Sequence, residues 1–306
     1  MIHLVTLNPA LDLDLALKDP ASGKIGEVLS SDVESGGKAL NIARFLKKEK
    51  IGFRTWLGTG GGNHPTHLLF RALLAREGLE PHYLSSKAPI RLNVVLEKGG
   101  KSRKYNHPGF ELDLTDFGLL DKALQKDDLL VLTGRLLQGM HQGLYGSWVK
   151  AFGRKGIRMV VDTSGPALRE ALDERPFFFK VNLFEFSQAS KLKLPGLQGV
   201  QTRLPALLKS GMLHGAVTNG PEGAILWNGP LACRVHSRQK VKNRMVVGAG
   251  DGFLAGYLRG LQSRKPFWDC AKFACATATA VAQTGIMGYD PRLTASLMKR
   301  VKISRI

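Results

Sequence analysis

The sequence predicts an α/β protein with a mainly parallel central sheet, and two observations favour that class. Short apolar runs alternate along the chain with stretches in which apolar residues recur at helical spacing. The 306 residues are 43% hydrophobic and 23% charged, the balance of a globular chain that can bury a large core. No internal repeat or low-complexity linker interrupts this pattern, so we expect one domain over residues 1–306.

Apolar runs are expected to form the strands of that sheet, and amphipathic segments are expected to form helices beside it. The expected strands are Ile2–Leu7, Gly52–Leu57, Leu129–Thr133, Arg158–Asp162, Phe177–Val181, Gly215–Thr218 and Ala224–Trp227. The expected helices are Ala39–Lys48, Thr66–Arg76, Gln142–Phe152, Thr202–Lys209, Gly252–Gln262 and Trp268–Gln283. In the helix after Gly250, apolar residues fall on one side at the spacing of an amphipathic helix.

One region, between Pro89 and Pro108, departs from this alternation. Two extended segments lie on either side of Gly99-Gly100, which is typical of a β-hairpin. Together with residues of about 12–35, this hairpin is expected to form a small sheet that projects from the main domain.

Composition excludes several classes of protein. No apolar run approaches the roughly 20 residues that span a bilayer. Met1–Leu7 is short, lacks a basic leader and runs into Asn8-Pro9, which favours a first strand over a signal peptide. The three cysteines, Cys233, Cys270 and Cys275, form no CxxC pair and suit a reducing cytosol. We therefore expect a cytoplasmic protein with no membrane segment.

The chain is strongly basic, with 44 Lys and Arg against 25 Asp and Glu and a formal net charge of +19. Such an excess is typical of nucleic-acid binding, but the basic runs are short and no finger or RNA-binding signature accompanies them. We expect the charge to be spread over solvated faces and to attract small anionic substrates.

The residues most informative about chemistry are Val246-Val247-Gly248-Ala249-Gly250-Asp251, directly before a predicted helix. Small residues let the backbone approach a phosphate, and the free N–H groups of the first helical turn point toward it. A carboxylate repels a resting phosphate, so Asp251 makes better sense as a base that faces an incoming hydroxyl group. Taken alone, the segment is explained at least as well by a tight turn whose aspartate caps the helix as by a phosphate site.

A second glycine-rich turn, Ser35-Gly36-Gly37-Lys38, also enters a predicted helix, on which Asn41 and Arg44 lie one turn apart. Together the two turns resemble the signature regions of the PfkB (ribokinase-like) carbohydrate kinases. The resemblance is closest to the phosphosugar branch, which contains 1-phosphofructokinase, the minor 6-phosphofructokinase and tagatose-6-phosphate kinase.

Other segments resemble this family in the same order along nearly the whole chain. They are Thr6–Asp12, Arg91–Val94, Asn106–Phe110, Val161–Leu168, Lys180–Glu185 and Thr218–Ala224. The resemblance implies a ribokinase-like three-layer sandwich with a mainly parallel central sheet and a small β-sheet lid. That lid would be formed by residues of about 12–35 and 88–108, and would pair with a second lid in a homodimer.

The resemblance also implies the reaction. Asp251 would be the catalytic base that takes the proton from the sugar hydroxyl attacking the γ-phosphate of ATP. The amides of Gly248, Ala249 and Gly250 would form an anion hole for the charge that develops during transfer. The expected enzyme is an ATP-dependent phosphotransferase acting on a ketohexose phosphate. Fructose 1-phosphate, which gives fructose 1,6-bisphosphate, is the first guess, with fructose 6-phosphate and tagatose 6-phosphate close behind.

The remaining site residues also follow from the resemblance. Sugar-binding positions would be Asp12, Gly37, Lys38, Asn41 and Arg91, of which Lys38 and Arg91 would hold the phosphate already on the substrate. ATP-binding positions would be Lys180, Asn182, Glu185, Thr218, Gly220 and Gly223. Among these, Asn182 and Glu185 would steer Mg²⁺ through water, because this ion keeps several of its waters.

The chain departs from the family pattern at several positions, of which three bear most on activity. Met245 and Val246 stand where polar residues are usual, and Arg135 stands in a turn that usually carries serine. These departures keep open a second hypothesis, a weak or inactive kinase-fold protein that binds sugar phosphate or nucleic acid. Because the catalytic aspartate and the metal-steering pair are retained, we favour the enzyme and do not expect nucleic-acid binding.

Three further readings are weaker. A Rossmann dehydrogenase is suggested by the glycines after Gly52–Leu57, but Asn63 stands where the last glycine of that motif is required. His64 and His67 lack a suitably spaced third ligand, so we expect polar caps rather than a metal site. Cys270 and Cys275, on an Ala/Thr-rich helix, are expected to pack rather than to react.

Overall fold

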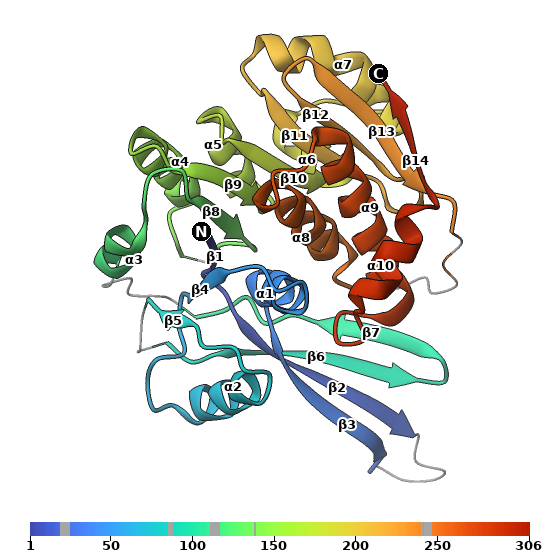
Figure 1. The fold of residues 1–306 in the computed structure, drawn as a ribbon. Coiled ribbons are helices and arrows are strands. Elements are labelled where there is room, and N and C mark those ends of the chain that lie inside the picture. Colours follow the sequence, from blue (N-terminus) through green and yellow to red (C-terminus); the bar gives the residue numbers. More distant parts are fainter. Residues whose placement is uncertain (19–24, 85–87, 111–116, 138, 240, 242–246) are drawn as a thin grey trace.

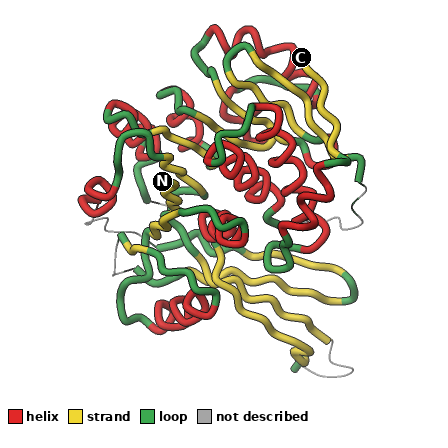
Figure 2. Tube along the Cα trace, in the orientation of Figure 1, coloured by secondary structure: helices red, strands yellow, loops and turns green. Residues whose placement is uncertain are grey.

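The computed structural model describes residues 1–18, 25–84, 88–110, 117–137, 139–239, 241 and 247–306. These residues form a ten-stranded sheet with helices on both faces and a separate four-stranded sheet, drawn below the main body in Figure 1. The strands of the small sheet run out beyond the helices that cover the large one (Figure 2).

The elements have the following bounds. The strands are β1 Ile2–Thr6, β2 Ala10–Lys18, β3 Glu27–Gly36, β4 Phe53–Leu57, β5 His82–Tyr83, β6 Arg91–Lys98, β7 Lys101–Tyr105, β8 Leu129–Thr133, β9 Arg158–Asp162, β10 Phe178–Asn182, β11 His214–Thr218, β12 Ala224–Asn228, β13 Leu231–Ser237 and β14 Val301–Arg305. The helices are α1 Lys38–Lys48, α2 Pro65–Arg76, α3 Phe117–Ala123, α4 Leu144–Arg154, α5 Pro166–Asp173, α6 Leu183–Ser190, α7 Gly196–Lys209, the 3₁₀ turn η1 Gly220–Glu222, α8 Ala249–Gln262, α9 Phe267–Thr284 and α10 Pro291–Met298.

The large sheet has the strand order β14-β13-β12-β11-β10-β9-β8-β1-β4-β5. Neighbouring strands from β5 through to β11 pair in parallel, whereas β12, β13 and β14 add an antiparallel extension at one edge. The mainly parallel sheet is therefore confirmed. The predicted strands omitted β13 and β14, in which basic residues interrupt the apolar ones.

Helices cover both faces of this sheet, and strand side chains alternate between two cores. In β8, Leu129 and Val131 face the core that includes α1, α8 and α9, while Leu130 and Leu132 face the core that includes α4 to α7. Burial on both faces explains why these strands read as continuous apolar runs. None of the helices in the described part of the chain is long and apolar enough to cross a membrane.

The small sheet has the order β3-β2-β6-β7. The hairpin predicted around Gly99-Gly100 is confirmed: β6 pairs with β7, and both glycines have positive φ in the turn. Strand register gives the sheet two chemically different faces. One face carries Leu13, Leu15, Val94, Leu96 and Tyr105, and the other carries Asp12, Asp14, Asn93 and Lys104.

Several local predictions can be compared directly with the structure. The helix predicted from Thr202 begins earlier, at Gly196, and α8 begins at Ala249 rather than Gly252. His64 accepts a hydrogen bond from the amide of Thr66 and caps α2 as expected. The expectation for His67 is wrong: its ring is fully buried and contacts the carbonyl oxygen of Ala88. Cys270 and Cys275 are buried, as expected of packing residues, and Cys233 is buried as well.

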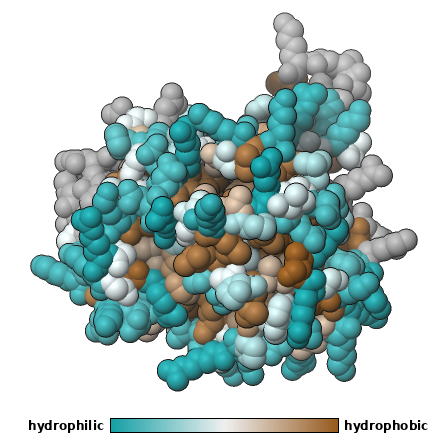
Figure 3. All heavy atoms as spheres, turned by 90° about the horizontal axis from the view of Figure 1, so that it is seen from above, coloured by the Kyte–Doolittle hydropathy of each residue, from teal (hydrophilic) through white to brown (hydrophobic). Residues whose placement is uncertain are grey.

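The basic excess of the chain is partly gathered in one place. A cavity of about 510 Å³ beside β14 is lined by six basic residues with Trp268, Val301 and Ile303. The basic residues are Arg238, Lys272, Lys299, Arg300, Lys302 and Arg305, and no acidic residue is among the described residues that line it. On the face drawn in Figure 3, hydrophilic side chains surround a more apolar central area.

Gly58→Ala is expected to destabilise the fold by about 1–3 kcal/mol, the usual cost of overpacking. A Cβ atom at Gly58, just after β4, would lie 2.2 Å from the carbonyl oxygen of Leu7, and this obstacle is backbone that cannot easily move. Gly153→Ala in α4 is the matched control, because nothing lies within 4 Å of its added Cβ atom. Urea unfolding of both variants measures the difference, and equal stability of the two would contradict the packing role of Gly58.

Candidate active site

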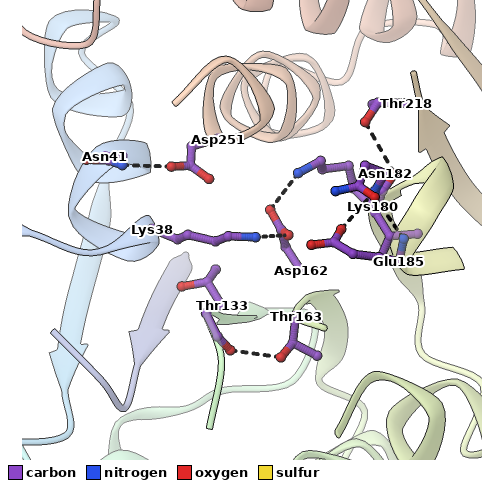
Figure 4. A network of polar contacts seen from close by, with 12 residues as sticks. Lys38, Asn41, Thr133, Asp162, Thr163, Lys180, Asn182, Glu185, Thr218 and Asp251 are labelled. Carbon is purple, nitrogen blue, oxygen red and sulfur yellow. Dashed lines mark hydrogen bonds and ion pairs between the residues drawn. The ribbon is translucent and has the colours of Figure 1, made fainter. Parts of the chain in front are cut away.

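Polar side chains gather where the carboxyl ends of four parallel strands meet at one edge of the large sheet (Figure 4). Thr133, Asp162, Asn182 and Thr218 are the last residues of β8, β9, β10 and β11. Open α/β sheets bind their ligands outside the carboxyl ends of the strands. Helices α1 and α8 bring further polar side chains to the same edge, so this is the candidate active site.

Asp162 is the centre of the polar network. Its carboxylate is fully buried, and it accepts hydrogen bonds from Lys38 Nζ at 2.6 Å and from Lys180 Nζ at 2.9 Å. Burial alone would raise the pKa of Asp162, but the ammonium groups of Lys180 and Lys38 outweigh it and lower that pKa. Asp162 therefore stays ionised, and its two hydrogen bonds connect strand β9 to helix α1 and to strand β10.

The two lysines differ in their access to solvent. The Lys180 side chain is 5% exposed, whereas that of Lys38 is 32% exposed. Burial acts to lower the pKa of Lys38, but the carboxylates of Asp162 and Asp251 outweigh it and raise that pKa above the ordinary value. Lys38 is thus a permanently charged and partly accessible donor at the edge of the site.

Asp251 lies in the first turn of α8, and its side chain is buried. Asn41 Nδ2, on α1, donates a hydrogen bond of 2.7 Å to its Oδ2. Burial raises the pKa of Asp251 above its ordinary value, Lys38 opposes the rise, and Asp162 adds to it. A buried carboxylate with a raised pKa is suited to accept a proton from a reacting group.

The amino end of α8 lies against Lys180. Gly248 caps this helix with φ of 86°, a left-handed conformation that glycine adopts without strain. A Cβ atom at Gly250 would lie 2.9 Å from Lys180 Nζ, so the ammonium group packs closely against the backbone there. The first-turn amides of a helix have no intrahelical acceptor and carry partial positive charge, so this end of α8 can hold an anion.

Asn182 and Glu185 form the capping box of α6. Asn182 Oδ1 accepts from the amide of Glu185 at 2.8 Å, and Glu185 Oε2 accepts from the amide of Asn182 at 2.9 Å. None of the described residues donates to Glu185 Oε1. The described part of the chain contains no group of three or more acidic, His or Cys side chains that would enclose a metal directly.

Asp12 belongs to a second polar group, at the base of the small sheet. Asn93 Nδ2 donates to Asp12 Oδ1 at 2.7 Å. A Cβ atom at Gly36 would lie only 2.1 Å from Asp12 Oδ2, so the carboxylate lies directly over this glycine. Because Gly36 and Gly37 run straight into Lys38, this group is connected to the main site by two residues of backbone.

Arg91 is largely occupied by contacts of its own. Its guanidinium donates to the carbonyl oxygens of His107 at 2.8 Å and of Asn8 at 3.2 Å, and to Asn93 Oδ1 at 3.3 Å. Burial lowers its pKa, and Asp12 opposes that effect. Its Nε is buried without a hydrogen-bond partner, so one donor remains unused.

The turn after β11 is shaped by glycines. Thr218 Oγ1 donates to the carbonyl oxygen of Val181 at 3.3 Å. Gly220 begins the turn η1 with φ of 49°, and Gly223 follows the turn with φ of 91°. A Cβ atom at Gly223 would lie 2.0 Å from the carbonyl oxygen of Val235, so no other residue fits there without a shift of the backbone.

The structure brings together most of the residues singled out from the sequence. Lys38, Asn41, Lys180 and Asp251 form one network, and the α6 cap and Thr218 lie at the same sheet edge. Asp12 and Arg91 lie instead in the second group, with Asn93. Arg135 is exposed, and Met245 and Val246 lie outside the described residues.

Sequence reasoning missed the roles of Asp162 and Arg44. Both stood in quoted motifs, yet no partner could be assigned to either. The available signal was that Asp162 ends an apolar run, because polar residues at the carboxyl ends of parallel strands face the ligand site.

Comparisons with known proteins agree with this geometry. Residues 8–290 match the family model described as pfkB family carbohydrate kinase. The 1-phosphofructokinase of Bacillus subtilis (strain 168) is 27% identical over 100% of both chains, and that of Escherichia coli (strain K12) is 28% identical over 99% of this chain and 97% of its own.

Solved structures share the fold. The phosphofructokinase-2 from Escherichia coli in complex with potassium has a TM-score of 0.87 and 23% identity over 97% of this chain and 98% of that chain. Arabidopsis thaliana ribokinase complexed with ribose and ATP has a TM-score of 0.75 and 18% identity over the same shares.

The mainly parallel sheet, the small second sheet and the site at the strand ends define a ribokinase-like phosphotransferase whose acceptor is an alcohol group. The chain belongs to the pfkB family of carbohydrate kinases. The expected fold class and family are therefore confirmed.

Asp251→Asn is expected to raise the stability of the protein at about pH 8. Because burial raises the pKa of Asp251, holding this carboxyl ionised costs folding free energy at any pH above its folded-state pKa. The gain should shrink as the pH falls through that raised pKa, and should vanish below the ordinary value of 3.8, where the folded and unfolded states are both protonated.

Melting temperatures across this pH range measure the effect. Asp121→Asn is the control, because Asp121 forms an exposed ion pair with Lys155. An Asp251→Asn protein that is less stable than wild type at about pH 8 would contradict the raised pKa.

Proposed function

We propose that this chain is an ATP-dependent sugar-phosphate kinase that transfers the γ-phosphate of ATP to a hydroxyl group of a ketohexose phosphate. The observation that carries the proposal is the buried carboxylate of Asp251 at the amino end of α8, held by Asn41 and facing Lys38. Relatives named 1-phosphofructokinase support fructose 1-phosphate as the first candidate, with fructose 1,6-bisphosphate as its product. Fructose 6-phosphate and tagatose 6-phosphate are the alternatives.

In this proposal Asp251 is the catalytic base. It takes the proton of the acceptor hydroxyl as that oxygen bonds to the γ-phosphorus, while the bond to the bridging oxygen of ADP breaks. Burial brings the base strength of Asp251 closer to that of a group working near neutral pH. The amides of Gly248, Ala249 and Gly250 stabilise the charge that develops on the transferred group, because they are fixed in place before the reaction.

The nucleotide would lie on the Lys180 side of Asp162. Lys180 meets the phosphates beside Gly250, and Thr218, Gly220 and Gly223 line the rest of the ATP site. Asn182 and Glu185 suit a Mg²⁺ ion held through water, because their cap bonds leave Glu185 Oε1 free of donors among the described residues. When bound with ATP, Mg²⁺ neutralises part of the phosphate charge.

The sugar phosphate would lie on the Lys38 side. Asp12, Gly37 and Asn41 bind sugar hydroxyl groups, and Lys38 and Arg91 bind the existing phosphate. An ammonium group has three donors, and only one of those on Lys38 is used by Asp162. Lys38 is partly exposed and has donors left for an anion, whereas the unused Nε of Arg91 is buried, so Arg91 would have to shift to reach one.

The small sheet would serve as the lid of a single kinase domain, with its polar face over the sugar. Its other face is apolar and includes exposed Val28, Leu92 and Tyr105. Pairing of two such faces in a homodimer would remove this surface from water. A structure of phosphofructokinase-2 from Escherichia coli described as tetrameric supports self-association in the fold.

Asp251→Asn is expected to reduce turnover by about 10²–10⁴-fold, the usual contribution of a general base. ADP release is measured with Mg-ATP over a panel of sugars and sugar phosphates, with Asp121→Asn as the control for a lost surface carboxylate. We expect turnover of one ketohexose phosphate that collapses only in the Asp251 variant.

Two other results would contradict parts of the proposal. Turnover of unphosphorylated sugars only would remove the phosphate-binding roles of Lys38 and Arg91. A folded protein that binds ATP but turns over nothing in the panel would favour the second hypothesis, a kinase-fold binding protein.

Leu96→Glu is expected to convert the dimer to a monomer, because it places a charge on the apolar face of the lid. Lys104→Glu is the matched control, since the same residue is then introduced on the opposite face of the neighbouring strand. Sedimentation should give twice the 33.4 kDa chain mass for wild type and control. A monomeric wild type would contradict pairing through the lid.

A further inference from the structure

Asn41 has an amide whose two ends face different partners. Its Nδ2 donates to Asp251 Oδ2 at 2.7 Å, and its Oδ1 accepts from Arg44 Nη1 at 3.0 Å. The reversed amide would set its oxygen against the carboxylate oxygen of Asp251 and its NH₂ group against the guanidinium. Because Arg44 has donors only, it admits just one of the two orientations.

We propose that Arg44 is a positioning residue, which fixes the direction of the Asn41 amide and through it the orientation and charge state of the Asp251 carboxylate. The proposal deepens the proposed function, since it rests on Asp251 being the base of that reaction. The contacts themselves hold whatever the substrate is.

Arg44 can perform this role because its guanidinium is fixed from three directions. Glu77, the C-cap residue of α2, accepts two bonds from it, at 2.6 Å and 2.8 Å. Ser35, near the end of β3, accepts two more at 2.7 Å through its carbonyl and hydroxyl oxygens. The Arg44 side chain is only 7% exposed. A forked guanidinium spans these partners, whereas a single ammonium group cannot.

The state of Asp251 responds to the direction of the Asn41 amide. The charged groups that face Asp251 are Lys38 on α1, Asp162 on β9 and Lys180 on β10. Burial raises the pKa of Asp251, and the hydrogen bond from Asn41 is one of the contacts that lower it. If Arg44 is lost, the amide is free to turn its oxygen toward Asp251, and the ionised base then loses a donor.

Two Arg44 variants test the proposal, with one matched control. Arg44→Met removes the guanidinium, and Arg44→Lys keeps the positive charge but not the fork. Arg259→Met is the control, because Arg259 makes a similar bond of 2.7 Å to Glu49, the C-cap residue of α1, without touching Asn41.

The first readout is the carboxyl titration of Asp251 by NMR, assigned by its absence in Asp251→Asn. We expect its pKa to rise in both Arg44 variants and to stay at the wild-type value in the control. The second readout is the pH profile of kcat/KM. We expect a loss of about tenfold or more on the acid limb, as for a lost hydrogen bond to a charged group, and a smaller change on the high-pH plateau.

A double variant separates positioning from a direct effect of charge. If Arg44 acts through the amide, Arg44→Met should add nothing to the Asp251 pKa shift already produced by Asn41→Leu. An additive shift would overturn the proposal, and so would an unchanged Asp251 pKa in folded Arg44→Met protein. If Arg44→Met does not fold, Glu77→Gln takes its place. We then expect a smaller rise in the pKa of Asp251, and an unchanged pKa would contradict the proposal.

Failure of the proposed function remains distinguishable from failure of this inference. The titration of Asp251 needs no substrate, so a rise in its pKa supports positioning even if the protein turns over no sugar phosphate. If the protein turns over a sugar phosphate but the pKa of Asp251 is the same in wild type and in the Arg44 variants, the proposed kinase activity is supported and the positioning role of Arg44 is contradicted.

Discussion

The site depends on one buried carboxylate, Asp162, shared between Lys38 and Lys180. A buried charge destabilises the folded protein unless it is paired. Removing one partner of a buried pair therefore costs far more stability than replacing both partners by apolar residues. The three side chains come from α1, β9 and β10, so they join three separate parts of the chain at the edge of the sheet. The charged site exists only because this pairing is complete.

Asp251 completes the electrostatic balance of the site. Two lysines and two aspartates carry no net charge together, so these four side chains are neutral as a set. The Lys38 ammonium group interacts with the carboxylates of both Asp162 and Asp251, and its side chain is partly exposed. The free amides of the first turn of α8 add partial positive charge beside these four residues.

The small sheet shows how one strand can serve two purposes. Neighbouring residues of β2 point to opposite faces, so Asp12 reaches the group beside Gly36 while Leu13 lies on the apolar face. A register slip of one residue would exchange these roles along the whole strand. The same alternation governs β9 and β10, where Asp162 and Lys180 share the side that α1 and α8 cover.

Most of the fold could be predicted from the sequence because it depends on local periodicity. The buried parallel strands are continuous apolar runs, and β8 and β9 were predicted with their observed bounds. β13 and β14 were missed because half of each strand is polar. Asp251 and Lys38 could be singled out because each follows a glycine-rich turn. The Lys38–Asp162 pair joins residues 124 positions apart, and only three-dimensional structure shows such a contact.

Strand β14 lies at the open edge of the ten-stranded sheet, where no other strand in the described part of the chain pairs with its outward backbone groups. An open edge of this kind is a template on which another chain can add a strand and start aggregation. Lys302 and Arg305 lie on β14, and the basic residues of the adjoining cavity surround it. Another copy of this chain would bring the same positive residues against this edge, and like charges so placed oppose edge-to-edge pairing of the larger sheet.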